Sequence, residues 1–501
     1  MLLSVSFRTK GGVTMAQSSI KKNFIYQMVY EVLVIILPFI TSPYVARVIG
    51  AEGLGTYSFS YSVAYYFVLF SMLGLKNYGN RSIAKVRDNK VQMNMTFSGI
   101  LFLHFIVSFI CCILYGGYIL ILRENRLYAL IQLGYVLSGL LDISWFYFGI
   151  EKFKLTVARN MLIKILNVVC IFVFVHEKED LWKYCLIMSL GMFLSSLTLW
   201  LPLKRYVRIV KVEKNEIMVH LKPMLILFIP AIAVSLYKYM DKIMIGSLSD
   251  KAQLGFYDNA EKVTNIPMTI ISSFGTVMLP KMSNLVAKKD ISAVTKYMNL
   301  SIKYVMCLAL ALACGLAAVG KVFAPIFWGN EFELSGTLIM GLAITIPFIS
   351  FANVIRTQYL IPNSKDKDYL VSVVAGAVIN LIINFLLIPK LGAIGATVGT
   401  ISAEVLVCLI QTYSVRNALP LFEYFRSFYI FIIFGFFMFG SVFFTGKILQ
   451  ANIFTLTIQV ISGIMIYGFL SLFYFIKTKD KTVIDMFLKF KDIAFEKRNK
   501  R

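Results

Sequence analysis

The chain has 501 residues, of which 58% are hydrophobic and only 15% are charged. A soluble domain carries roughly a quarter charged residues, so this composition excludes a protein that folds in water. We expect an all-α polytopic membrane protein.

Apolar runs of about 20 residues, long enough to cross the hydrocarbon core as helices, recur along the chain. The alternating pattern of a β-barrel is absent. Fourteen spans are predicted, near residues 24–46, 56–75, 96–117, 127–149, 155–175, 183–203, 223–246, 254–279, 297–319, 335–358, 369–388, 393–415, 427–445 and 453–476.

Basic residues give the chain a net charge of +24, but their placement argues against nucleic-acid binding. Most of them fall in the two tails and the even-numbered loops, for example in LKRYVRIVKVEK. This asymmetry is the positive-inside pattern, which predicts a multi-pass protein with both termini in the cytoplasm. The basic C-terminal tail is also suited to contact with anionic headgroups.

Cysteine and histidine give no sign of a metal site. All seven cysteines lie inside predicted spans, and the three histidines are scattered along the chain. Neither set has the spacing of metal ligands, so we expect no metal and no disulfide framework.

The first 14 residues are polar and basic, without the apolar centre of a cleavable signal. The Lys-Gly-Gly-Val that precedes Met15 can be encoded by a ribosome-binding sequence. We therefore hypothesise that translation begins at Met15.

Short matches at an offset of 200 residues indicate an internal repeat. LGTY at 54–57 opens the second span and LGFY at 254–257 opens the eighth. Spans 1–6 would then be repeated as spans 7–12, with spans 13 and 14 appended. The expected parts are a cytoplasmic segment (1–22), an N-lobe (23–203), a basic linker (204–222), a C-lobe (223–415), helices 13–14 (416–476) and a basic cytoplasmic tail (477–501).

Prolines interrupt several spans, and each removes a backbone hydrogen bond and favours a kink. Pro38 and Pro230 occupy similar places in spans 1 and 7, and Pro267 and Pro347 lie in spans 8 and 10. Such interruptions mark either cavity-lining helices or ordinary kinks.

The stretch SLYKYMDKIMIGSL places Lys238, Asp241 and Lys242 inside an otherwise apolar span. A charge inside the bilayer is costly, so it is expected to face protein or water. The two lysines share a helical face, and Asp241 can neutralise one of them, which leaves one positive charge. The alternative is a purely structural ion pair.

Further polar residues lie within the predicted spans, and several of them can be explained by a structural role instead of a role in transport. Lys164 and Lys303 can extend along the lipid to the cytoplasmic interface, and Asn380 and Asn384 can bond between helices. Besides these four, the polar residues are Asn160 and Asn167 in span 5, Glu261 and Lys262 in span 8, Asn23, Gln27 and Glu31 in span 1, Asp142 in span 4 and Glu404 in span 12. The intramembrane excess is cationic, which suits an anionic substrate.

Enzyme functions have little support. The loops between spans are too short to fold into a catalytic domain. The acidic pair in NSKDKD is read as a solvated turn. The glycines of LGAIGATVGT, Gly392, Gly395 and Gly399, are read as close helix packing rather than a nucleotide cradle.

Several segments carry a family resemblance, among them LPFITSPYVARVIGAEGLGTYSFSYS, SLYKYMDKIMIG and LGFYDNAEKV. The chain resembles the bacterial polysaccharide and O-antigen repeat-unit flippases of the multidrug/oligosaccharidyl-lipid/polysaccharide exporter superfamily, over nearly all of residues 23 to about 475. The related lipid II flippases carry an arginine in the second span, whereas this span is uncharged between Gly55 and Leu75.

The resemblance implies fourteen helices in two rocking six-helix lobes plus an extra pair. It also implies a flippase of the bacterial cytoplasmic membrane, not an enzyme, that moves undecaprenyl-pyrophosphate-linked oligosaccharide by alternating access for capsule, exopolysaccharide or O-antigen synthesis. Expected partners are that substrate, membrane lipids and polysaccharide polymerase machinery.

We predict that Lys238 and Lys242 attract the pyrophosphate and that Lys164 and Lys262 extend the positive track. Asp241 would hold the lysines apart when the site is empty. No cofactor is expected, and coupling to H⁺ or Na⁺ would use Glu31, Asp241 or Glu404.

Two alternatives remain. A cation-coupled multidrug exporter would want acids rather than a basic excess in its cavity. A membrane polysaccharide polymerase would need a large external loop.

Overall fold

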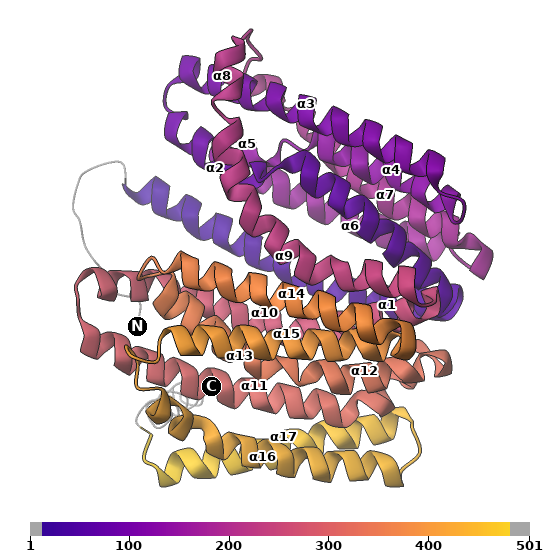
Figure 1. The fold of residues 1–501 in the computed structure, drawn as a ribbon, viewed down its shortest axis with the longest axis vertical. Helices are drawn as coiled ribbons and strands as arrows, with labels where there is room; N and C mark the ends of the chain where they lie inside the picture. Colours follow the sequence, from indigo (N-terminus) through magenta and orange to yellow (C-terminus); the bar gives the residue numbers. More distant parts are fainter. Residues whose placement is uncertain (1–12, 481–501) are drawn as a thin grey trace, which may run out of the picture. The chain divides into compact units, whose positions relative to one another are not determined.

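The computed structural model describes residues 13–480; the side chains of residues 13–35, Phe153, Pro230, Tyr237 and Lys238 lie outside the described part. Within it the chain forms helices and no strand, which confirms the predicted fold class (Figure 1). Twelve helical segments of the described residues are long and apolar enough to cross a membrane.

Helix α10 (Lys251–Ala287) is not among these twelve, although it has 37 residues. It carries Asp258, Glu261 and Lys262 within five positions, and these charges lower its hydropathy. α10 nevertheless coincides with the predicted eighth span.

The first compact unit runs to Gly255. Its core is aromatic around Trp145, Phe146 and Tyr147, all fully buried. Its helices are α1 (Val13–Met72), α2 (Leu75–Val86), α3 (Lys90–Ile121), α4 (Arg126–Leu141), α5 (Ser144–Gly149), α6 (Phe153–Phe174), α7 (Leu181–Leu197), α8 (Lys214–Met218) and α9 (Leu221–Leu248), with short 3₁₀ turns η1 (Lys178–Asp180), η2 (Thr198–Trp200) and η3 (Leu203–Arg205).

Helix α1 contains the first two predicted spans. They are separated at Gly50, whose φ of 77° and ψ of 175° are not helical. A residue with a Cβ is strained at such a positive φ, so glycine permits the change of direction between the spans.

The fourth predicted span is also broken, between α4 and α5. The Asp142 carboxylate accepts a hydrogen bond from the backbone N–H of Ser144 at 2.8 Å. The indole of Trp200 donates to the carbonyl of Leu141 at 2.9 Å. The isolated acid predicted in span 4 thus satisfies backbone groups that a helix break leaves open.

The second compact unit begins at Phe256. Besides the rest of α10 it contains α11 (Ile291–Trp328), η4 (Asn330–Phe332), α12 (Glu333–Ala343), α13 (Thr345–Ile355), the π-helical segment η5 (Arg356–Leu360), α14 (Asp366–Leu391), α15 (Ala393–Ser414), α16 (Leu421–Ile448) and α17 (Ile453–Lys477). The predicted tenth span is α12 and α13 together. It breaks at Ile344, three residues before Pro347.

Small residues set the helix packing in the second unit. A Cβ at Gly395 would lie 2.6 Å from the Leu387 carbonyl, and one at Gly399 would overlap the Asn384 amide. The glycines of LGAIGATVGT therefore allow α15 to approach α14 closely, as predicted.

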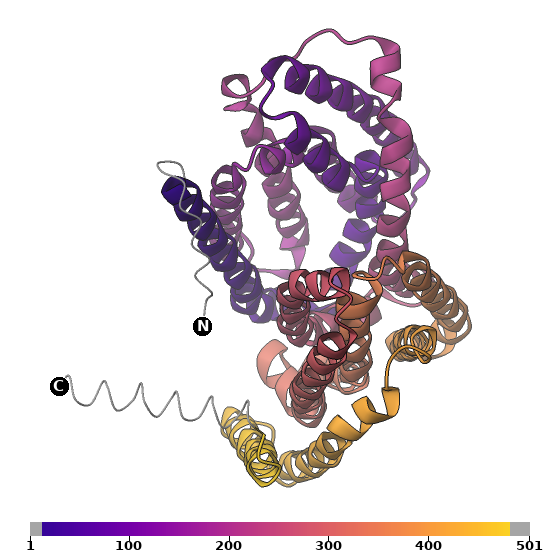
Figure 2. The same ribbon diagram turned by 90° about the vertical axis from the view of Figure 1, so that its left-hand side faces the viewer.

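The appended helices α16 and α17 pack against each other and both contact α11. They lie side by side in both ribbon views, coloured from orange to yellow (Figures 1 and 2). Helices 13 and 14 of the sequence prediction therefore belong to the second unit.

The contact-based boundary differs from the predicted lobe boundary. The first unit ends at Gly255 and includes α9, whereas the predicted C-lobe begins at residue 223. The two units are defined by contacts in this one conformation, whereas the predicted lobes are defined by the internal repeat of the sequence. The predicted lobe limits therefore stay a prediction.

Two glycines at equivalent places in the repeat meet where the start of α10 crosses α1. A Cβ at Gly55 would overlap the carbonyl oxygen of Lys251, and a Cβ at Gly255 would overlap the carbonyl oxygen of Ala51. The contact is reciprocal at the offset of 200 residues seen in the sequence. This pseudo-symmetric contact agrees with the predicted internal repeat.

We expect Gly55→Ala and Gly255→Ala each to lower the free energy of unfolding by about 2 kcal/mol, because the new Cβ collides with backbone that cannot rotate away. Thermal unfolding of the purified protein in detergent measures the effect. Gly116→Ala in α3 is the matched control, since no atom lies within 4 Å of its Cβ. Equal melting temperatures for all three variants would contradict the close crossing.

Candidate functional site

The charged stretch of the sequence lies on α9, which packs against α1. Ser235, Tyr239 and Lys242 recur at helical spacing and so share one face of α9. Asp241 is buried, with 3% of its surface exposed, and Lys242 is half-buried. The structure therefore places the Asp241 and Lys242 side chains within protein.

A set of tyrosines forms a continuous chain of ring contacts at this face. Tyr65 of α1 stacks on Tyr239 of α9, with ring centroids 3.8 Å apart. Tyr61 of α1 stacks on Tyr135 of α4 at 4.9 Å. We call this set the tyrosine ladder; its members are Tyr57, Tyr61, Tyr65 and Tyr66 of α1, Tyr135 of α4, Tyr184 of α7 and Tyr239 of α9.

The charges of α9 lie beside the tyrosine ladder. The ammonium of Lys242 is 5.8 Å from the centre of the Tyr239 ring, within the range of a cation–π contact. Asp241 acts electrostatically on Tyr66, whose hydroxyl donates to the Ser235 carbonyl at 3.2 Å. One cation, one acid and several phenols therefore share a small volume.

Sequence reasoning named Asp241 and Lys242 but missed the ladder. The available signal was the spacing of Tyr57, Tyr61 and Tyr65, which places three phenols on one face of a span. A tyrosine costs more to bury than a phenylalanine unless its hydroxyl is satisfied, so such a row inside the membrane is informative.

Lys164 lies half-buried on α6, and part of its predicted polar stripe has structural partners. The Asn160 amide oxygen accepts from Arg159 Nη2 at 2.6 Å and from the Ser195 hydroxyl at 3.1 Å. Asn167 packs against Gly191 of α7. Lys164 and Lys242 each have an interaction partner, so their proposed roles do not depend on unpaired charge.

Lys262 has a local partner on its own helix. Its ammonium lies 2.6 Å from the Asp258 carboxylate, one turn earlier on α10, and 42% of its side chain is exposed. This pairing reduces the contribution that Lys262 makes to an excess of positive charge. Its proposed contact with substrate stays a prediction.

The acids named for ion coupling are dispersed. Asp241 lies in the first unit and Glu404, 7% exposed on α15, lies in the second. Glu31 and the side chain of Lys238 lie outside the described residues. Among the described side chains, Asp241 and Lys242 therefore lie next to each other on α9, Lys164 lies on α6, and Lys262 and Glu404 belong to the second unit.

The asparagines of span 11 bond within their own helix. The Asn384 amide donates to the Asn380 oxygen at 3.1 Å, and both side chains are buried. Among the described residues no group of three or more His, Cys, Asp or Glu side chains could hold a metal ion.

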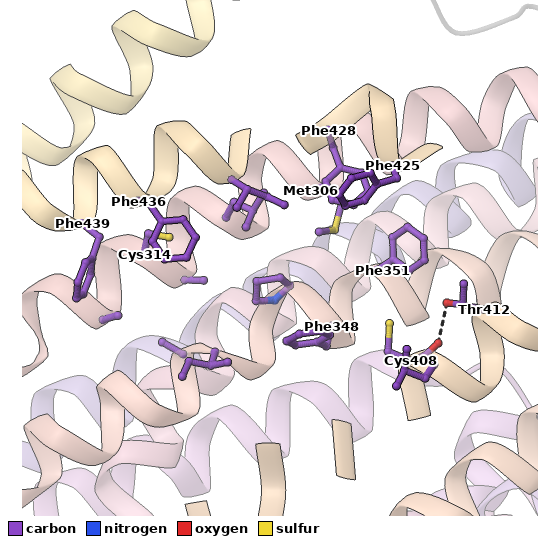
Figure 3. Close-up of a pocket in the computed structure, with 18 of the residues that line it drawn as sticks. Met306, Cys314, Phe348, Phe351, Cys408, Thr412, Phe425, Phe428, Phe436 and Phe439 are labelled. Atoms are coloured by element: carbon purple, nitrogen blue, oxygen red, sulfur yellow. Dashed lines mark hydrogen bonds between the residues drawn. The ribbon is translucent and has the colours of Figure 1, made fainter. Parts of the chain in front are cut away.

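A large apolar cavity of about 1090 Å³, open on one side, lies within the second unit, and several of its lining residues, such as Phe422 and Phe436, are exposed. Figure 3 shows Met306 of α11 with Phe425 and Phe428 of α16 at one part of its wall. Its lining includes seven phenylalanines and neither a tyrosine nor a charged residue. The Thr412 hydroxyl in the wall donates to the Cys408 carbonyl at 2.7 Å. The cavity is thus suited to hydrocarbon.

Lys303 does not simply extend to the interface, as one interpretation of the sequence had it. Its ammonium lies 2.5 Å from the Asp480 carboxylate, which also accepts from the Tyr304 hydroxyl at 2.6 Å. The two charged side chains are only 16% and 8% exposed. These contacts connect Asp480, which follows α17, to α11.

Comparison with known proteins assigns the family. The model of the family described as "Polysaccharide biosynthesis protein" matches residues 20–286, which is more than half of the chain. The chain belongs to this family. The resemblance to polysaccharide flippases noted in the sequence is therefore confirmed.

Two relatives of this family member match along nearly their whole length. A Shigella dysenteriae protein named "Putative O-antigen transporter" is 23% identical over 79% of this chain and 100% of its own. The "Capsular polysaccharide biosynthesis protein CapF" of Staphylococcus aureus is 24% identical over 78% of this chain and 98% of its own.

Solved structures show which fold the chain adopts. The lipid II flippase MurJ in an inward closed conformation is similar with a TM-score of 0.77 at 15% identity, over 91% of this chain and 99% of its own. An inward-facing multidrug resistance MATE family transporter of the MOP superfamily matches with a TM-score of 0.57 at 13% identity, over 73% and 92%. The chain therefore shares the fold of these two transporters.

Lys303→Met should lower the free energy of unfolding by about 3 kcal/mol, because it leaves a buried carboxylate without its cation. The double variant Lys303→Met/Asp480→Leu should recover most of this loss, since it removes both charges. Thermal unfolding in detergent measures both. Lys262→Met is the control and should cost less than about 1 kcal/mol, because its pair with Asp258 is more exposed.

If Lys303→Met and the double variant melted at the same lowered temperature, the ammonium would act through something other than its pairing with Asp480.

Proposed function

We propose that this protein is a flippase that moves undecaprenyl-pyrophosphate-linked oligosaccharide repeat units across the bacterial cytoplasmic membrane by alternating access. The observation that carries the proposal is similarity, along nearly the whole length of both relatives, to a protein named "Putative O-antigen transporter" and to a capsular polysaccharide biosynthesis protein. The superfamily fold supports the same conclusion.

The site chemistry agrees with a substrate that has an anionic, polar headgroup and an apolar tail. Lys242 and Lys238 supply cations for the pyrophosphate, which accepts charge-assisted hydrogen bonds. Asp241 holds the two lysines apart when the site is empty. Lys164 and Lys262 add positive charge further along the path, while the isoprenoid remains in the lipid.

Transport needs a source of energy, and we propose coupling to a proton or sodium gradient. Asp241 and Glu404 are the candidate carriers among the described residues, since both are acids buried in spans. Glu31 remains a third candidate. Both termini are proposed to lie in the cytoplasm, and polysaccharide polymerase machinery is the proposed consumer of the product.

The alternative is a cation-coupled multidrug exporter, which has the same fold. The family match favours the flippase. Asp258 and Asp480 both sit in ion pairs, and so are poorly placed to receive a cationic drug. A membrane polymerase is the enzymatic alternative, and it predicts polymer synthesis by the purified protein from lipid-linked units.

Deletion of the gene in a polysaccharide-producing host tests the proposal. We expect loss of surface polysaccharide and accumulation of lipid-linked repeat units on the inner leaflet, both reversed by the plasmid-borne gene. Normal export together with a changed drug-resistance profile would instead support the exporter.

In the same strain, Lys238→Gln/Lys242→Gln should reduce export roughly tenfold or more, because each lost charge-assisted bond contributes about 1.5–3 kcal/mol. Arginine at both positions should retain most export, since it keeps the charge. Lys390→Gln, at an exposed site at the end of α14, is the matched control. Export that survives loss of both ammonium groups would remove these lysines from the site.

A further inference from the structure

We propose that the tyrosine ladder is a carbohydrate-stacking surface, which takes the sugar rings of the oligosaccharide while the basic residues take its pyrophosphate. The proposal rests on the flippase function and assigns separate residues to the two parts of the headgroup. Its ligand class is the neutral pyranose ring.

The geometry of α1 matches a chain of sugars. Tyr57, Tyr61 and Tyr65 follow one another every four residues, so their rings are spaced about 6 Å apart along the helix axis. Tyr57 and Tyr61 are stacked with centroids 5.9 Å apart. A row of rings at this interval can meet successive monosaccharides.

Ring chemistry explains why aromatic faces suit sugars. One face of a pyranose presents C–H groups, which carry slight positive charge, and the face of an aromatic ring is negative. The phenol hydroxyl can in addition exchange hydrogen bonds with sugar hydroxyls. This recognition tolerates different sugars and lets a chain slide, because each contact is weak.

The ladder is accessible enough to receive a ligand. Tyr57, Tyr61, Tyr65 and Tyr239 are all half-buried, whereas Tyr135 behind them is only 7% exposed. The half-buried rings come from α1 and α9, and Tyr135 of α4 supports Tyr61 by stacking and by a hydrogen bond at 3.4 Å between their hydroxyls.

The choice of tyrosine over phenylalanine is the observation that points to a polar ligand. The apolar cavity of the second unit is lined by seven phenylalanines and no tyrosine. Phenylalanine also supplies the exposed aromatic residues Phe436, Phe437 and Phe444 of α16. Tyr429 is the exception on α16, so phenylalanine predominates where aromatic side chains of this helix are exposed, because a hydroxyl in hydrocarbon is costly.

The charge arrangement fits a headgroup with two parts. Lys242 lies beside Tyr239, which contacts both Tyr61 and Tyr65, while Tyr57 lies against Tyr184 of α7. A pyrophosphate held at Lys242 would therefore keep its attached sugars next to the row of rings.

Headgroup length provides the test. Proteoliposomes containing the full-length protein would be given either undecaprenyl-pyrophosphate-linked N-acetylglucosamine or the complete lipid-linked repeat unit extracted from the producing host. Flipping is measured as oxidation of the sugar by periodate added outside the vesicles. The variants are Tyr61→Leu/Tyr65→Leu, Tyr61→Phe/Tyr65→Phe and Lys242→Gln, with Tyr429→Leu on α16 as the control for loss of an exposed tyrosine.

We expect the leucine variant to move the complete repeat unit about tenfold more slowly than the wild type, while movement of the single-sugar lipid changes less than about twofold. The phenylalanine variant should keep most of the activity on both substrates, because the ring faces remain. Lys242→Gln should slow both substrates equally, since both carry the pyrophosphate.

Equal slowing of both substrates by the leucine variant, or no slowing of either, would overturn the stacking surface. A structural defect would produce the equal slowing, and melting temperatures of the variants would identify it. A wild-type protein that flips neither lipid would overturn the flippase function itself, and the stacking surface with it.

Discussion

The structure depends on one constraint, which is that a polar group within the bilayer must find its partner inside the protein. The chain meets it in three ways. Charges pair with each other, as Lys262 does with Asp258. Where a helix breaks, a side chain can accept a hydrogen bond from an unpaired backbone N–H, as the Asp142 carboxylate does from Ser144 at the start of α5. The phenols of the ladder lie against one another and against neighbouring backbone.

The protein has an apolar surface and a polar aromatic surface, and this constraint explains the difference in their composition. The cavity of the second unit contains hydrocarbon side chains and one hydroxyl that is already bonded to backbone. The face shared by α1 and α9 contains phenols, a lysine and a buried acid. A lipid-linked sugar has the same two characters in one molecule, so a carrier needs surfaces of both kinds.

The fold could be predicted from the sequence because hydropathy is a local property. Each predicted span corresponds to a helix, to part of one, as in α1, or to a pair of broken helices, and two glycines at the offset of the repeat, Gly55 and Gly255, make close reciprocal contacts. Local pairing was also within reach, since Asp258 and Lys262 are one turn apart on the same helix. Lys262 is among the predicted site residues, whereas its partner Asp258 is not.

Long-range partners could not be predicted in this way. Lys303 and Asp480 are separated by most of the second unit in sequence, and only the packing of α17 on α11 brings them together. Only part of the tyrosine ladder could be predicted. The spacing of the tyrosines within α1 shows that they share a helical face, but the sequence does not show that tyrosines of α4, α7 and α9 pack against them. Hydropathy identifies which segments span the membrane, but it does not show which helices pack against each other.

The attachment of Asp480 has a practical consequence for protein engineering. Asp480 lies three positions after α17 ends at Lys477, and its carboxylate pairs with Lys303 of α11. A fluorescent fusion or affinity tag should therefore be joined downstream of residue 480. A junction even a few residues earlier would detach the terminal helix from its anchor while leaving every hydrophobic segment in place.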